Sequence, residues 1–237
     1  MVKKILGIFL VFLFCATGLV FAEGRKPVQF SIFSPIQIFR AKDSIGGLRF
    51  NLIYGDNKNM SGITLSTGWN NTSGDMKGVE LGAVNWTDGV SYGWRNSLIN
   101  YTGKRFVGLD IGAVNIVKGD ATGVELGIGN WNWGFFHGYQ GGVINYADNR
   151  FVGWQDAVVN LTKGDCSGLQ TGVVNYVGSS MTGLQLGLLW NYAKQMNGLQ
   201  VGFFNGSDSL NGVQIGLINY NGNCDPMEGM VFVNWSF

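Results

Sequence analysis

The stretch Gly183-Leu184-Gln185-Leu186-Gly187-Leu188-Leu189 decides the fold of this chain, because it recurs along the sequence in variant form. It reappears, for example, as Gly78-Val79-Glu80-Leu81-Gly82-Ala83-Val84-Asn85. Asparagines recur with it at intervals of 14 to 16 residues, mostly 15. A fixed period of this length indicates a tandem-repeat architecture. The recurring asparagines are Asn70, Asn85, Asn100, Asn115, Asn130, Asn145, Asn160, Asn175, Asn191, Asn205, Asn219 and Asn234.

Each repeat alternates apolar and polar residues in the manner of a β-strand. With the first glycine of a repeat numbered zero, positions +1, +3 and +5 are mostly apolar, as in Leu184, Leu186 and Leu188. Position +2 is polar in every repeat, and glycines surround it. Successive side chains of a strand point to opposite faces, so this period of two predicts a strand, and the density of glycine argues against a helix.

The remaining residues of each repeat are typical of tight turns. Examples are Lys118-Gly119-Asp120 and Lys163-Gly164-Asp165. One strand of about 11 residues and one turn per repeat favours an antiparallel meander. Counting residues 28–39 as a further strand gives about 14 strands, and an even number is typical of a closed bacterial β-barrel. We therefore predict an all-β protein in which the repeats close into a barrel.

The barrel hypothesis predicts what each face of a strand contacts. A strand of 11 residues is about 36 Å long, and at a tilt of about 40° it rises about 28 Å, enough to cross an apolar band of about 25 Å. The apolar face would contact outer-membrane lipid and the polar positions would line the lumen. The predicted closing strand contains Val231, Val233, Trp235 and Phe237. The predicted lumen-lining belt comprises Arg49, Glu80, Arg95, Asp110, Glu125, Gln140, Gln155, Gln170, Gln185, Gln200 and Gln214.

A β-solenoid of stacked coils is the alternative fold. It explains why residues 101–108 resemble residues 146–153, since stacked coils tolerate any repeat number, and why Asp156 occurs on an otherwise apolar face. Against it, a coil needs two corners, and each repeat has one clear turn. The solenoid predicts a stacked side-chain ladder formed by Asn85, Asn100, Asn115, Asn130, Asn145, Asn160, Asn175, Asn205 and Asn219.

The first 22 residues are typical of a secretory signal peptide. Lys3 and Lys4 precede an apolar run at 5–20, and Val20-Phe21-Ala22 fits a cleavage site. Residues 23–237 are then expected to form a single repeat-built β domain. Loss of the two lysines reduces 16 basic residues to 14, against 15 acidic residues. This near-neutral balance argues against nucleic acid as a partner.

No residue pattern nominates an enzyme. His137 is the only histidine, and no serine or cysteine has an evident base and orienting partner. We therefore expect no catalytic residues, no cofactor and no metal site. Cys166 occupies a position where other repeats carry Met or Phe, so we expect a buried thiol. A disulfide to Cys224 is the alternative in an exported protein.

The repeats also resemble a family of bacterial exported surface repeat-containing proteins. The resemblance rests on tandem Gly-Leu-Gln-x-Gly-x-x-Asn units, which match best at 168–176, 183–192, 198–205 and 212–220. It covers nearly all of the chain after the leader. It implies export to the outer membrane or cell surface of a Gram-negative bacterium, and it supplies no reaction or ligand.

The sequence thus predicts a non-enzymatic outer-membrane or surface β-repeat protein, structural or pore-forming, with outer-membrane lipid as its partner. The alternative function is that of a surface-displayed β-solenoid that acts as an adhesin or binding module.

Overall fold

The computed structural model describes residues 24–237, so the expected signal peptide lies outside the described residues. The described chain contains strands and no helix, and accordingly none of its segments is a helix long and apolar enough to cross a membrane. Two compact units divide the chain after Thr102. The first unit contains β1 (Lys26–Phe33), β2 (Ile36–Gln37), β3 (Ile45–Asn51), β4 (Tyr54–Asn57), β5 (Met60–Ser66), β6 (Trp69–Thr72), β7 (Met76–Leu81), β8 (Val84–Thr87) and β9 (Ser91–Thr102).

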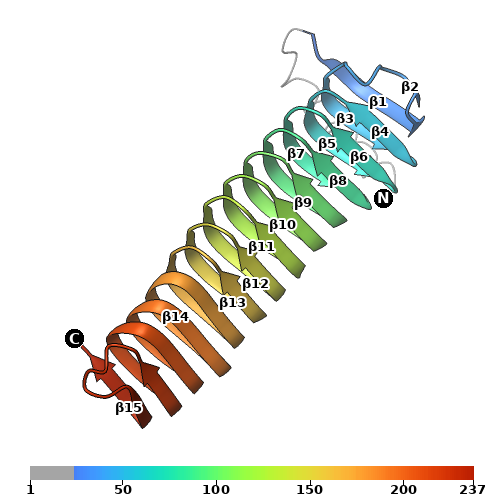
Figure 1. Cartoon of the computed structure of the whole chain (residues 1–237). Helices are drawn as coiled ribbons and strands as arrows, with labels where there is room; N and C mark the ends of the chain where they lie inside the picture. The colour runs from blue at the N-terminus through green and yellow to red at the C-terminus, as the bar shows by residue number, and fades with distance from the viewer. Residues whose placement is uncertain (1–23) are drawn as a thin grey trace, which may run out of the picture. The chain divides into compact units, whose positions relative to one another are not determined.

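The first unit is a stack of coils, each of which lies on the coil before it (Figure 1). Strands of neighbouring coils are parallel and in register, so that β3 pairs with β5, β5 with β7, and β7 with β9. A coil here contains two strands joined by a bend: β5 and β6 form one coil, and β7 and β8 the next. β1 pairs in parallel with β3 and antiparallel with the short β2, which gives this end of the stack a hairpin.

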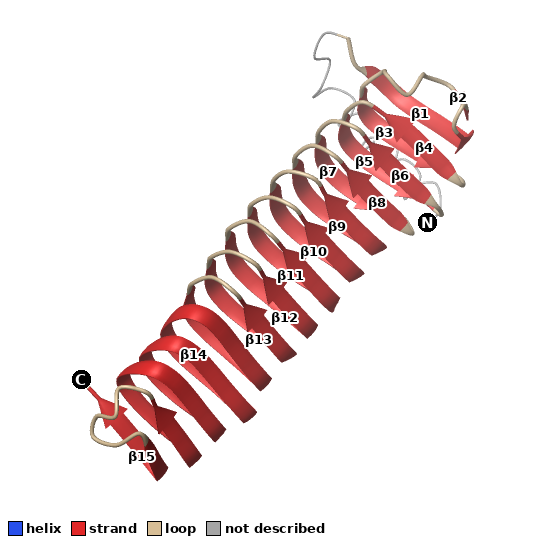
Figure 2. Ribbon diagram, in the orientation of Figure 1, coloured by secondary structure: helices blue, strands red, loops and turns tan. Residues whose placement is uncertain are grey.

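The second unit repeats the same coil with longer strands. Its elements are β10 (Phe106–Val117), β11 (Ala121–Asn132), β12 (Phe136–Ala147), β13 (Phe151–Thr162), β14 (Cys166–Asn221) and β15 (Gly229–Ser236). β10 to β13 supply one coil each, and β14 continues as strand through the later coils, as the uninterrupted red ribbon of Figure 2 shows. Each residue pairs with its equivalent one coil later, for example Gln140 with Gln155.

The parallel register shows that the chain is a β-solenoid of 15-residue repeats. The antiparallel meander and the closed barrel predicted from sequence are wrong, and the alternative fold is confirmed. The prediction failed because the alternation of side chains was taken to run through the whole repeat. In β11, Glu125 and Asn130 are both buried although five positions separate them. An unbroken strand would place them on opposite faces; the bend at residues 127–129 brings both inside.

Each coil is therefore flattened, with two facing strand segments and two corners. We call residues +4 to +6 of a coil the bend, and the residues before each new coil the turn. Side chains cross from one segment to the other inside the coil: Gln185 Nε2 donates to the Tyr192 carbonyl at 3.3 Å and Gln214 Nε2 to the Tyr220 carbonyl at 2.9 Å. Near the turn corner the interior is apolar, and Phe136 and Phe151 stack with ring centroids 5.2 Å apart.

β15 caps the last coil. It pairs antiparallel with the end of β14, from Gly212 opposite Ser236 to Tyr220 opposite Gly229. The predicted closing-strand residues Val231, Val233, Trp235 and Phe237 all project outward, while Asn234 and Ser236 between them are buried. The predicted alternation holds from Val233 to Phe237 and fails at Phe232, which is also exposed. The predicted closing role is wrong, because the strand covers the end of a stack and closes no barrel.

The first glycine of each coil is required by the stacking itself. Gly153 has φ of 135°, in the region that disfavours L side chains, and a Cβ there would overlap the carbonyl oxygen of Gly138 in the coil below. The same overlap recurs along the column, as at Gly168 over Gly153. Only a hydrogen at this position lets two coils approach to hydrogen-bonding distance.

We predict that Gly153→Ala destabilises the solenoid strongly. The strained backbone alone costs about 1–3 kcal/mol, and displacement of the neighbouring coil adds to it. The free energy of unfolding in urea, followed by circular dichroism, measures the loss. Gly229→Ala is the matched control, because nothing lies within 4 Å of a Cβ built there. Equal stability of the two variants would contradict this account of the glycine column.

Candidate functional site

The predicted lumen-lining belt forms a buried polar column. Its residues are fully shielded from solvent inside the coils of each unit, so they do not line a pore. Arg49 contacts Glu80 in the first unit, and the side chains from Glu125 to Gln214 contact one another in the second. The pore-lining role predicted from sequence is therefore wrong, although these residues do occupy equivalent positions in successive coils. The residues concerned are Arg49, Glu80, Arg95, Asp110, Glu125, Gln140, Gln155, Gln170, Gln185, Gln200 and Gln214.

In the second unit the column is a continuous glutamine ladder. Gln140 Nε2 donates to Glu125 Oε2 at 2.8 Å, and each later glutamine donates to the Oε1 of the glutamine one coil earlier. All donors in this ladder therefore point toward the N-terminal end of the unit, where the first acceptor is a carboxylate. The later Nε2–Oε1 distances are 2.9 Å (Gln155–Gln140), 2.7 Å (Gln170–Gln155), 2.8 Å (Gln185–Gln170), 2.7 Å (Gln200–Gln185) and 2.8 Å (Gln214–Gln200).

The repeat asparagines form a second ladder, as the solenoid hypothesis predicted. Within each unit, the Nδ2 of an asparagine donates to the Oδ1 of the asparagine one coil later, as from Asn145 to Asn160 at 3.0 Å. The other amide hydrogen reaches a backbone carbonyl beside the bend; Asn160 Nδ2, for example, lies 2.8 Å from the Thr171 carbonyl. The ladder runs through Asn70, Asn85 and Asn100 in the first unit and through Asn115, Asn130, Asn145, Asn160, Asn175, Asn191, Asn205 and Asn219 in the second.

The two ladders run in opposite directions. Asparagine donors point toward later coils and glutamine donors toward earlier ones. Their amide dipoles therefore oppose each other along the stack, and a long row of buried amides accumulates little net dipole.

In the first unit, an amide occupies the asparagine position even in a coil that lacks the asparagine itself. Gly55 occupies the asparagine position of its coil, and the Asn51 amide fills the vacated space and donates to Asn70 Oδ1 at 2.7 Å.

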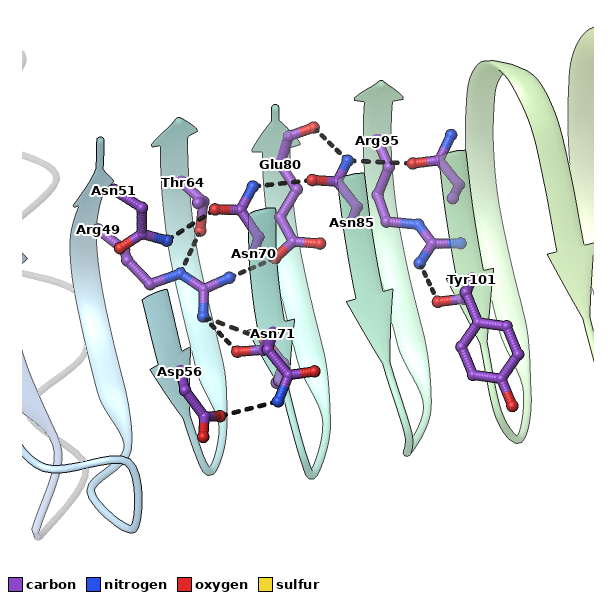
Figure 3. Close-up of polar contacts among 12 residues, drawn as sticks. Arg49, Asn51, Asp56, Thr64, Asn70, Asn71, Glu80, Asn85, Arg95 and Tyr101 are labelled. Atoms are coloured by element: carbon purple, nitrogen blue, oxygen red, sulfur yellow. Dashed lines mark hydrogen bonds and ion pairs between the residues drawn. The ribbon is translucent and has the colours of Figure 1, made fainter. Parts of the chain in front are cut away.

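Charged groups take the glutamine position in the first unit (Figure 3). Arg49 Nη2 lies 2.5 Å from Glu80 Oε1, and Arg49 Nε donates to Thr64 Oγ1 at 3.1 Å. A further bond runs from Nη1 to Thr72 Oγ1 at 3.1 Å. Burial holds the pKa of Arg49 below its ordinary value, and the charge of Glu80 partly offsets this. Removing one partner of a buried pair leaves an uncompensated charge, so these residues fix the coil stack and are not free for chemistry.

The buried polar side chains of both columns are thus engaged in hydrogen bonds within and between coils. Between residues 24 and 237, no three His, Cys, Asp or Glu side chains gather where they would hold a metal ion. His137 is exposed near the start of β12.

The exposed surface of the second unit divides into an apolar and a charged corner. The three bend positions of its coils contain only Gly, Ala, Val, Ile, Leu and Phe, with an extra Trp190 in one coil. We call this strip the apolar edge. It consists of residues 112–114, 127–129, 142–144, 157–159, 172–174, 187–190, 202–204 and 216–218. The alternation rule missed it, because the bend residues at +6 were assigned to the polar face.

The turns at the opposite corner carry the charges. In the coils from Phe106 to Asn221, Asp156 is the single charged residue outside a turn that is not fully buried. It is half-buried, and Thr171 Oγ1 donates to its carboxylate at 2.7 Å. Aromatic rings contact the charged residues of the turns: Tyr192 Oη donates to Asp208 at 2.8 Å, and Lys118 Nζ lies 3.5 Å above the Trp133 ring of the next turn. Burial, together with the bond to Asp208, raises the pKa of Tyr192 to about 12.

Comparison with known proteins adds no assignment: no family model, no curated protein and no solved structure matches the chain.

We predict that Asn145→Ala weakens the fold by at least about 2 kcal/mol, because an unsatisfied buried polar group costs about 1–3 kcal/mol. The substitution leaves Asn130 Nδ2 without its 2.8 Å acceptor and removes the donor to Asn160 Oδ1. Urea unfolding measures the change. Asn149→Ala, in an exposed turn four residues later, serves as control and is expected to change stability by less than about 0.5 kcal/mol. A similar loss in both variants would argue against the ladder.

The two described cysteines are free, so the alternative disulfide is not formed. Cys166 is buried as expected from its position, and burial raises the pKa of its thiol to about 12. Because the thiolate is the reactive form, we predict that maleimide at pH 8 modifies exposed Cys224 within minutes and leaves Cys166 unmodified until urea unfolds the chain. Peptide mass mapping separates the sites. Equal labelling of both cysteines in the folded protein would contradict the burial of Cys166.

Proposed function

We propose that this chain is a non-enzymatic β-solenoid displayed on the surface of a Gram-negative bacterium, where it binds a partner along its stacked repeats. The observation that carries the proposal is that each coil separates buried polar side chains from exposed ones. The buried amides of the polar positions bond to one another in the ladders, and the exposed side chains recur at the same places on successive coils, where a partner can contact them. Stacked repeats commonly use such extended periodic surfaces for binding.

Three observations support export and display. The first 22 residues fit a secretory signal peptide. The Gly-Leu-Gln-x-Gly-x-x-Asn units resemble those of bacterial exported surface proteins. The ladders bury their hydrogen bonds inside the coils, which suits a protein that must hold its shape outside the cell. A pore is not part of the proposal, because the residues expected to line it are buried within the coils.

Lysine labelling on intact cells tests the location. A membrane-impermeant amine reagent is expected to label exposed Lys118 and Lys163 in intact bacteria to the same extent as after lysis. A periplasmic protein of the same strain, which should label only after lysis, provides the control. Labelling of the two lysines only in lysed cells would contradict surface display, whatever the chain binds.

A further inference from the structure

We propose that the apolar edge of the second unit inserts into the hydrocarbon layer of a lipid membrane surface, with the charged turns left in water. This inference rests on the proposed function and names a lipid membrane as the partner of one surface of the repeats. The proposal concerns one corner of the coils and requires no strand or helix to cross the membrane.

The edge is uniformly apolar over eight coils. Its bend positions hold no charged and no hydrogen-bonding side chain apart from the indole of Trp190. Leu188 is 71% exposed, Trp190 55% and Phe203 48%. Parallel strands stack about 4.8 Å apart, so seven steps between eight coils give a strip roughly 34 Å long. Apolar patches of this extent are rare on soluble monomers and mark sites for a partner or a membrane.

Two departures from the regular coil enlarge the edge. The coil that begins at Gly183 has one extra residue, and the insertion places Trp190 at the bend while the ladder continues from Asn175 to Asn191 at 2.9 Å. In the capping strand, Phe232 pairs opposite Gly216, the bend glycine of the last coil. It has φ of 69° and is 68% exposed. A non-glycine residue in this region is strained, and here the strained residue presents an aromatic ring on the apolar edge.

A shallow, open groove lies along part of the apolar edge. It has a volume of about 460 Å³ and runs across successive coils. Glycines at position +4 form its floor, and apolar side chains at +3 and +5 form its walls. The lining residues are Leu186, Gly187, Leu188, Val201, Gly202, Phe203, Ile215 and Gly216. Because every lining side chain is apolar, this depression suits an acyl chain better than a polar ligand.

The order of side-chain types from the bend to the turn favours a lipid membrane, and not another protein, as the partner of the apolar edge. Aliphatic residues occupy the bend, tyrosines such as Tyr192 lie toward the turns with their hydroxyls on turn carboxylates, and Lys and Asp occupy the turns. The same order describes segments that lie in a membrane interface, with charges in water, polar-tipped rings at the headgroups and aliphatic groups below. Five residues separate the turn from the bend, roughly 17 Å, so the bend reaches the acyl region while the turns stay outside.

The first unit supplies an internal comparison. Its equivalent groove is lined by Phe30, Phe50, Leu52 and Leu65, but also by Ser66 and Thr67 at the bend. Polar side chains therefore interrupt the strip there. The second unit is the part of the chain whose bend excludes them completely.

Vesicle binding by the exported protein, with its N-terminus verified by mass spectrometry, tests the proposal. The probe is a vesicle of phosphatidylcholine, which has no net charge, examined by flotation at low and high salt. We expect binding at both salt concentrations, and brominated acyl chains should quench the wild-type fluorescence more than that of Trp190→Phe. The double substitution Leu188→Asp with Phe203→Asp should lower partitioning at least tenfold.

A matched double variant, Asn149→Asp with Gln195→Asp, adds the same two charges at exposed turn positions and should bind as the wild type does. Leu188→Ser with Phe203→Ser keeps the test valid if the charged pair misfolds, and circular dichroism verifies each fold. Absence of vesicle binding by the wild type, or undiminished binding by both edge variants, would overturn the proposal. So would a lipid-free dimer that the edge substitutions dissociate, since a second copy would then be the occupant. These outcomes leave surface display to its own test on intact cells.

Discussion

The structure depends on the in-register stacking of each residue on its equivalent one coil away. Because of this constraint, the side chains at equivalent positions of successive coils contact one another. Each column must therefore consist of side chains that can hydrogen-bond to, or pack against, a side chain of the same type. Glutamine and asparagine meet it because an amide carries both a donor and an acceptor. Glycine meets it at the first position of each coil because the carbonyl of the coil below leaves no room for a Cβ. Aromatic pairs such as Phe136 and Phe151 meet it by stacking.

The same constraint explains the unusual core. A 15-residue coil encloses too little space for a large apolar interior, and polar side chains therefore fill much of it. They are tolerated because each amide finds its partner in the next coil, and because the two ladders oppose their dipoles. Where charge enters the column, as at Arg49 and Glu80, the partners lie two coils apart. Arg49 also donates to the hydroxyls of Thr64 and Thr72. The interior of the solenoid thus relies on hydrogen bonds between coils, and large apolar side chains such as Leu188 and Trp190 lie on the exterior.

The repeat length, the strand character and the column of polar residues were predictable from sequence, because each depends on periodicity alone. The closed barrel was predicted wrongly because nothing in the sequence states where a strand bends. Val159 and Asn160 are adjacent, and strict alternation places Asn160 outside and Val159 inside. The bend at Ala157 reverses them. The recurrence of asparagine was the signal that favoured the solenoid, since a ladder requires the same residue in every coil. The apolar edge required coordinates, because its residues are contiguous only after the bend is known.

The central claim is that the coils stack in parallel at one repeat per step, and distances between spin labels test it most directly. His137, Thr182 and Asn211 are equivalent positions within the second unit, immediately before the first glycines of their coils. Labels at His137 and Thr182 lie three coils apart, and labels at His137 and Asn211 lie five coils apart. At about 4.8 Å per step, the account predicts backbone separations of about 14 Å and about 24 Å. Separations that do not grow with the number of coils would contradict it.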